Sequence, residues 1–216
     1  MAVSILSDYD IQKESTLHLG MIPHLTLYID TLFSVGYPQY ILTKAAELDD
    51  HETIENEFYP LYDKILNYWF PATEGYDVSP QWTIPNSGRS VDSTIAFVIE
   101  YQQRPLLLLE IVPPSDFHLE SARECAIIQI IQRLDEIGPT NQHVQRLYAI
   151  SAIGKRWRAA YVTKGKGSKD GQPVRGVTDV NSLKSAAEQC WNPDITSDAS
   201  WAALQGIVDT IKSYVV

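Results

Sequence analysis

Two carboxylates stand at the ends of a predicted β-hairpin between residues 89 and 114. Asp92 enters one apolar segment, and Glu110 interrupts a second segment that is otherwise aliphatic. An ionised carboxylate among aliphatic side chains carries a large desolvation cost unless a metal, a proton or a donor compensates it. We therefore expect Glu110 to have such a partner.

The register of this hairpin decides whether the two acids meet. Val, Ile, Phe and Leu predict strands over Asp92–Tyr101 and Leu106–Val112. A three-residue loop, Gln102–Arg104, would place Glu110 opposite Ala96 and the first acid on the same face. A two-residue loop would shift the pairing and turn the first acid away. The three-residue loop is favoured because the proline that follows it can start the second strand.

This hairpin and the helix predicted after it resemble the core of the PD-(D/E)XK nuclease-like superfamily. The resemblance implies that Asp92 and Glu110 hold Mg²⁺ or Mn²⁺ with help from a glutamate of the preceding helix, for which Glu57 is preferred over Glu55. The family has a lysine two residues after the second acid, where this chain has Val112. The resemblance thus implies a degenerate member, a pseudoenzyme with an incomplete catalytic set.

The missing cation can come from another element in folds of this kind. The resemblance makes Arg123, on the following helix, the nearest candidate, and Gln129 further along that helix a possible assistant or a solvated side chain. The candidate catalytic set is therefore Asp92, Glu110, Arg123 and Gln129. The alternative without a metal has Asp92 capping a turn and Glu110 bonded to an Arg or Tyr of a neighbouring element.

The elements around the hairpin predict an α/β (α+β) fold, which the resemblance makes a restriction-endonuclease-like mixed β-sheet flanked by helices. Helices are predicted where apolar residues recur at helical spacing, and strands where β-branched and aromatic residues gather between turn residues. Asp50 is the expected N-cap of the first long helix, and Pro60 is expected to kink or split it. Besides the hairpin, the predicted elements are helix 52–69, strand 81–84, helix 119–137, strands 147–153 and 157–162, and helix 199–214.

Length and composition predict one folded domain over residues 1–216. Hydrophobic residues make up 44% of the chain, which is more than a disordered chain carries. We expect residues 1–50 to be an extra N-terminal segment packed on a nuclease-like core at about 52–165, and residues 176–216 to be a C-terminal helical segment.

The cellular setting is predicted from what the sequence lacks. No apolar run is long enough to span a bilayer, and the first residues do not match a signal peptide. We therefore expect an intracellular protein, cytoplasmic or nuclear, with no membrane partner. Cys125 and Cys190 are the two cysteines, too few for a disulfide framework or a thiolate zinc site, and both are expected to be reduced.

Charge is unevenly distributed along a chain whose net charge is −10. The segment from Lys155 to Arg175 contains seven basic residues and a single acidic residue, Asp170. Such a segment on an acidic body predicts either a local strip for nucleic acid or another anion, or a solvated hairpin. The candidate strip residues are Lys155, Arg156, Arg158, Lys164, Lys166 and Lys169.

Three functions remain open from the sequence. The favoured one is a nuclease-like protein with impaired catalysis that acts as a binding or interaction module, with nucleic acid or a protein as partner. The alternative is an active metal-dependent nuclease that uses Asp92 and Glu110 with a displaced cation. The third is an unrelated α+β protein. Whether the chain is an enzyme is therefore left open, with the module preferred because Val112 stands at the lysine position.

Overall fold

The structure is a computed structural model that describes residues 36–84, 94–138, 145–163, 188–192 and 194–215. The chain divides into two units, Met1–Val35 and Gly36–Val216, and every described residue belongs to the second. Asp92 and the lysines at 164, 166 and 169 lie outside the described residues.

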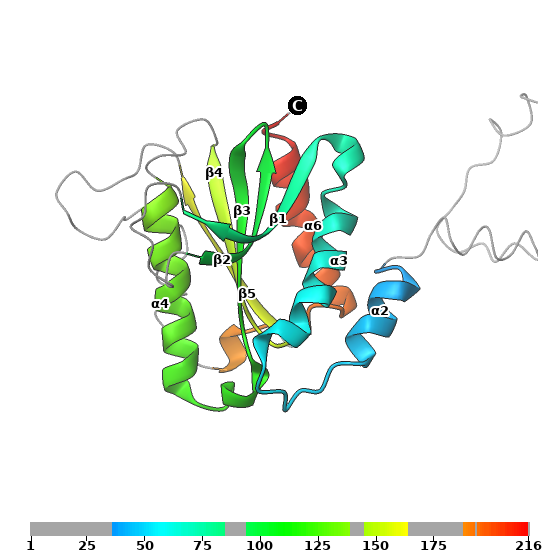
Figure 1. Cartoon of the computed structure of the whole chain (residues 1–216), viewed down its shortest axis with the longest axis vertical. Helices are drawn as coiled ribbons and strands as arrows, with labels where there is room; N and C mark the ends of the chain where they lie inside the picture. Colours follow the sequence, from blue (N-terminus) through cyan, green and yellow to red (C-terminus); the bar gives the residue numbers. More distant parts are fainter. Residues whose placement is uncertain (1–35, 85–93, 139–144, 164–187, 193, 216) are drawn as a thin grey trace, which may run out of the picture. The chain divides into compact units, whose positions relative to one another are not determined.

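The described part of the second unit contains helices and strands, which Figure 1 shows coloured in sequence order. The elements, with 3-10 helices labelled η, are α2 (Gln39–Ala46), η1 (Glu55–Phe58), α3 (Tyr59–Trp69), η2 (Ala72–Glu74), β1 (Tyr76–Thr83), β2 (Thr94–Tyr101), β3 (Arg104–Val112), η4 (Pro114–Asp116), α4 (Glu120–Ile137), β4 (Arg146–Ile153), β5 (Arg156–Thr163), η5 (Glu188–Cys190) and α6 (Asp198–Lys212). Within this part of the chain, no helix is both long enough and apolar enough to cross a bilayer.

The strands form one mixed five-stranded sheet in the order β1-β2-β3-β4-β5. Neighbouring strands are antiparallel except β3 and β4, which are parallel and are joined through α4. A parallel connection needs a crossover, and the 18 residues of α4 supply it. The predicted α+β class, with a mixed sheet flanked by helices, is confirmed.

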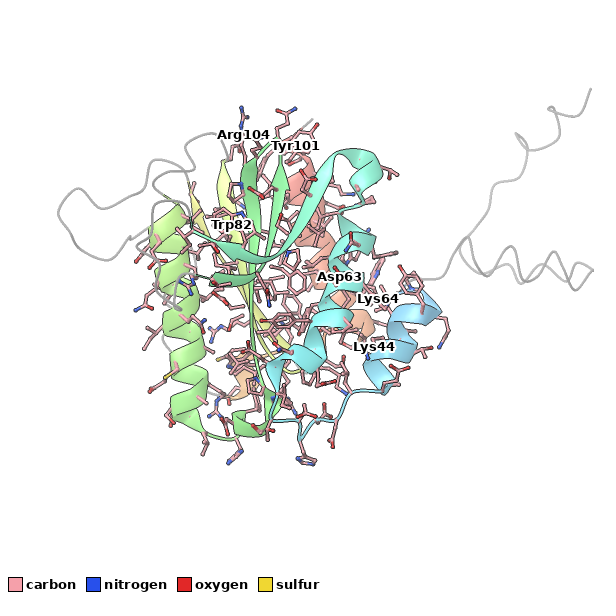
Figure 2. The ribbon with its side chains drawn as sticks, in the orientation of Figure 1. Lys44, Asp63, Lys64, Trp82, Tyr101 and Arg104 are labelled. Carbon is pink, nitrogen blue, oxygen red and sulfur yellow. The ribbon has the colours of Figure 1, made fainter. Side chains whose placement is uncertain are left out.

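Helices cover both faces of the sheet (Figure 1). On one face, α4 packs Ile127, Ile130 and Leu134 against the sheet. On the other face, apolar side chains of α2, α3 and α6 pack against the same sheet and form a second hydrophobic cluster. Central strand β3 is buried on both sides, as expected for a strand between two helical layers. Lys44 of α2 and the neighbouring Asp63 and Lys64 of α3 are labelled in Figure 2 on the helical side remote from α4.

The first long helix begins later than predicted. The expected helix 52–69 is divided into η1 and α3, and Pro60 lies in the first turn of α3, where its missing N–H costs nothing. The predicted split at Pro60 is therefore confirmed. The N-cap prediction for Asp50 is wrong, because this residue lies in the preceding loop and pairs with Lys155 at 3.0 Å.

The first strand was predicted too short. Instead of 81–84, β1 covers Tyr76–Thr83 and continues through Pro80. A proline normally argues against a strand, but β1 lies at the edge of the sheet, where a missing N–H is tolerated. Next to Pro80, Gln81 has a φ of 49°, in the left-handed region, and the regular pairing with β2 skips this residue.

The β2–β3 hairpin has a shorter turn than predicted, and a bulge follows the turn. The connection is a two-residue turn, Gln102 and Gln103, with φ values of 52° and 62°, so the three-residue loop is wrong. A bulge at Leu106 then shifts the pairing by one residue, because Ile99 pairs with Leu107 whereas the next residue of β2 pairs with Pro105. As a result, Phe97 faces Leu109, and the regular pairing between β2 and β3 ends at this pair.

Candidate functional site

Glu110 lies near the end of β3 and is only 4% exposed. Its side chain points to the α4 face of the sheet, where Oε1 accepts a hydrogen bond from Nε of Arg133 at 2.7 Å. The backbone N–H of Ala96 donates a second hydrogen bond to this carboxylate. The charge is therefore compensated by a cation from the neighbouring helix and by the backbone of the neighbouring strand.

Arg133 uses all three of its guanidinium nitrogens. Besides the bond to Glu110, Nη2 donates to the carbonyl of Thr94 at 3.2 Å and Nη1 pairs with Glu136 at 3.3 Å. One side chain thus connects α4 with both β2 and β3. The Thr94 carbonyl lies at the start of β2, two residues after Asp92 in the sequence, so Arg133 reaches the end of the strand where the first acid was expected to act.

Burial dominates the ionisation of this pair. Desolvation raises the pKa of Glu110, and the hydrogen bond and charge of Arg133 oppose that rise without cancelling it. Burial lowers the pKa of Arg133, but the Glu110 and Glu136 carboxylates outweigh it and raise that pKa overall. The arginine therefore remains charged over the pH range in which the carboxylate titrates.

The donor set around Glu110 does not suit a hard cation in the described part of the site. A divalent ion needs several free oxygen ligands, whereas Oε1 of Glu110 is already in contact with a positive charge. Val112, at the lysine position, is a half-buried aliphatic side chain. Among the described residues, no group of three or more His, Cys, Asp or Glu side chains is placed to hold a metal.

The other predicted site residues do not gather around Glu110. Glu57, the preferred helix acid, is exposed in η1. Its neighbour Glu55 accepts a hydrogen bond from the hydroxyl of Tyr59 at 3.2 Å. Burial, followed by the Glu55 carboxylate, raises the pKa of that tyrosine to about 12. The α4 residue Gln129 is half-buried.

Arg123 has a local role. It is 6% exposed, donates a hydrogen bond to the carbonyl of Phe117 and lies with Cζ 5.5 Å from the centre of that ring. The arginine that meets Glu110 is instead Arg133, which sequence reasoning missed. One sequence signal was present: Arg133 falls three residues after Ile130 and four before Ile137, on the buried stripe of α4. A charged residue in such a stripe requires a buried partner.

The three described residues of the basic strip lie in different environments. Lys155 pairs with Asp50, Arg156 is exposed beside Phe117, and Arg158 is 6% exposed on β5. These three side chains therefore do not share one solvated face. Lys164, Lys166 and Lys169 belong to the undescribed segment after β5.

The comparisons with known proteins give a distant similarity in fold. No family model matches the sequence, and no curated protein matches it. The type IIG restriction endonuclease BpuSI is a solved structure with a similar arrangement, at 12% sequence identity and a TM-score of 0.43. The match covers 77% of this chain and 18% of that chain.

Proposed function

We propose that this chain is a nuclease-like domain that does not hydrolyse phosphodiesters and acts as a binding module. The observation that carries the proposal is the contact of Glu110 with Arg133 at 2.7 Å, together with the other two bonds of the guanidinium. In a metal-dependent nuclease this carboxylate holds a divalent ion. Here a structural arginine takes that charge-compensating role.

The order of the elements supports the nuclease-like part of the proposal. One helix, three antiparallel strands, a crossover helix and a parallel fourth strand follow one another, and Glu110 lies near the end of the third strand. This is the arrangement that the sequence resemblance implied. The half-buried Val112 supports the loss of hydrolysis, because it cannot orient water or neutralise developing charge.

An active nuclease is the second candidate, and one observation favours it. Arg133 is a cation beside Glu110, so it is placed where a displaced lysine substitute would act. In that case Asp92 and Glu110 would share Mg²⁺ or Mn²⁺, and the arginine would leave Glu110 during the reaction. The buried, fully bonded guanidinium makes such a movement costly.

Hydrolysis assays separate the two candidates. Single- and double-stranded DNA and RNA are incubated with the purified protein and Mg²⁺ or Mn²⁺, beside Asp92→Asn and Arg133→Lys. The module predicts no cleavage above that of Asp92→Asn. Efficient cleavage by the wild type that Asp92→Asn abolishes, and that Arg133→Lys retains at least in part because it keeps the cation, would establish the nuclease and overturn the module.

The partner that we propose for the module is nucleic acid, bound in part through the basic strip. Each phosphate that the strip neutralises adds roughly 0.7 to 0.9 to the slope of log affinity against log salt. Replacing Lys164, Lys166 and Lys169 by alanine should lower affinity and slope without changing thermal stability. Binding equal to the wild type, or no wild-type binding at low salt, would favour a protein partner instead.

A further inference from the structure

A cavity of about 270 Å³ lies at the end of the sheet where β3 leads into η4 and where β4 turns into β5. Four segments line it: the loop before η1, the η4 region, the β4–β5 turn and the segment between η5 and α6. The lining includes His51, Ser115, Phe117, His118, Arg156 and Asp194. Glu110 and Arg133 are not among the lining residues.

The donors in this cavity come from different directions. His51 lies on the loop before η1, Ser115 and His118 lie in and after η4, and Arg156 begins β5. A planar carboxylate is matched by one fork of donors, whereas a phosphate group presents oxygens in three dimensions. Donors that converge from three chain segments therefore suit a phosphate group.

Arg156 is the charge that is available to such a ligand. Its guanidinium carbon lies 4.5 Å from the centre of the Phe117 ring, and this cation–π contact holds it at the cavity. Among the described residues, Arg156 forms no ion pair. Lys155, in contrast, is engaged by Asp50 at 3.0 Å and by the carbonyl of Leu48 at 3.4 Å.

The two acids of the lining are already engaged. Asp50 pairs with Lys155, so their charges offset each other. Oδ1 of Asp194 accepts hydrogen bonds from the N–H of Thr196 at 2.8 Å and from its hydroxyl at 2.7 Å. Asp194 therefore has a structural role in its turn, although its negative charge still weakens the attraction of the cavity for an anion.

We propose that this cavity binds a single phosphate group through Arg156, with His51, His118 and Ser115 as further donors. The group comes from the 5′ end of a nucleic acid strand or from a small phosphate monoester. The proposal deepens the proposed function, because it names the chemical group that the binding module recognises. It does not depend on the absence of hydrolysis.

Two substitutions test the site because they act in opposite directions. Arg156→Gln removes the free charge and should weaken phosphate binding about tenfold or more. Asp194→Asn removes a negative charge but keeps the oxygen that accepts from Thr196, so it should strengthen binding. Arg104→Gln is the matched control, because Arg104 is an exposed arginine at the β2–β3 turn, at the opposite end of the sheet from η4 (Figure 2).

The measurement uses the full chain and four probes: inorganic phosphate, adenosine monophosphate, and one oligonucleotide with either a 5′-phosphate or a 5′-hydroxyl end. Thermal unfolding of every variant confirms that it is folded. A preference for the 5′-phosphate that Arg156→Gln abolishes and Arg104→Gln retains supports the strand end as the source. Monophosphate binding that shows the same dependence, without a preference between the oligonucleotides, supports a small monoester.

Three results overturn the proposal on their own, and a fourth does so while it leaves the module intact. The first three are no binding of any phosphate probe, binding that Arg156→Gln leaves unchanged, and Asp194→Asn weakening the affinity of a folded protein. General nucleic acid binding that makes no distinction between 5′ ends, with no binding of adenosine monophosphate, would remove the phosphate site and leave the proposed module intact. If the wild type binds adenosine monophosphate but no nucleic acid, the phosphate site stands and the nucleic acid-binding module is overturned.

Discussion

Glu110 and Arg133 form a buried ion pair that joins the central strand β3 to the crossover helix α4, with 2.7 Å between Oε1 and Nε and side-chain exposures of 6% and 8%. Removing one partner of such a pair leaves an uncompensated charge in the core. We therefore expect Arg133→Met to lower the free energy of unfolding by about 3 to 5 kcal/mol. Urea unfolding followed by circular dichroism measures this change.

The control for this substitution uses the same arginine. Glu136 pairs with Arg133 at 3.3 Å but its side chain is 49% exposed, so Glu136→Gln should change stability by no more than about 0.5 kcal/mol. The double variant Glu110→Leu with Arg133→Met removes both charges and should recover most of the loss. A single Arg133→Met variant as stable as the wild type would contradict the role of the pair in the fold.

The stability of the protein should depend on pH through Glu110. Burial raises the pKa of this carboxyl group, so the native state takes up its proton at a higher pH than the unfolded chain does. Its contribution to the free energy of unfolding therefore falls as pH rises from the ordinary carboxyl range through the native pKa. Glu110→Gln cannot titrate, so the stability of the variant minus that of the wild type should increase with pH over the same window. A difference that decreases with pH would indicate a lowered pKa instead.

The turn between β4 and β5 should not tolerate a side chain at Gly154. This residue has a φ of 59°, and a Cβ added there would lie 2.6 Å from Cβ of Pro114. Its carbonyl also accepts a hydrogen bond from the buried hydroxyl of Tyr62 at 2.8 Å. We expect Gly154→Ala to cost about 1 to 3 kcal/mol or more in thermal or urea unfolding.

Gly206 provides the opposite case. It lies inside α6, is exposed, and a Cβ added there would meet nothing within 4 Å. Gly206→Ala should therefore stabilise the protein by about 1 kcal/mol, because alanine is the better helix former. Equal effects at Gly154 and Gly206 would show that neither the conformation nor the space at the β4–β5 turn is as described.

The two-residue turn of the β2–β3 hairpin offers a stabilising change. Gln102 and Gln103 both have positive φ, a conformation that Asn-Gly adopts more readily than Gln-Gln. Replacing the pair by Asn-Gly should raise the free energy of unfolding by about 1 kcal/mol. As a control, Gln132→Gly on the exposed side of α4 should lower it by a similar amount. Destabilisation by Asn-Gly would argue for the longer loop.

Much of the sheet was predictable because local composition and strand pairing agree. The apolar run of β3 has no polar face, which is typical of a central strand, and the apolar stripe of α4 predicted the helix that covers the sheet. Strand β1 was harder, because Pro80 suggests a break and the tolerance for it depends on β1 being at the edge. The turn at Gln102 was also missed, since the bulge at Leu106 that shifts the pairing has no clear sequence signature.

The sequence predicted the residue type of the partner of Glu110, but not its position in the chain. An Arg or Tyr from a neighbouring element was one expectation, and α4 contains both Arg123 and Arg133. Choosing between them requires knowledge of which turn of α4 packs next to Glu110 of β3. This depends on the tertiary packing of the helix on the sheet. The cavity beside Arg156 was missed for the same reason, because its lining comes from segments that are far apart in the sequence.

The interrupted course of β1 bears on how this sheet meets other molecules. An open edge strand offers a row of free N–H and C=O groups on which another chain can add a strand. In β1 that row is broken, because Pro80 has no N–H to donate and Gln81 leaves the regular extended conformation. The β1 edge of the sheet therefore disfavours strand addition by a partner. It also disfavours self-association into extended sheets. A ligand of this domain is more easily accommodated at the strand ends or against the helices.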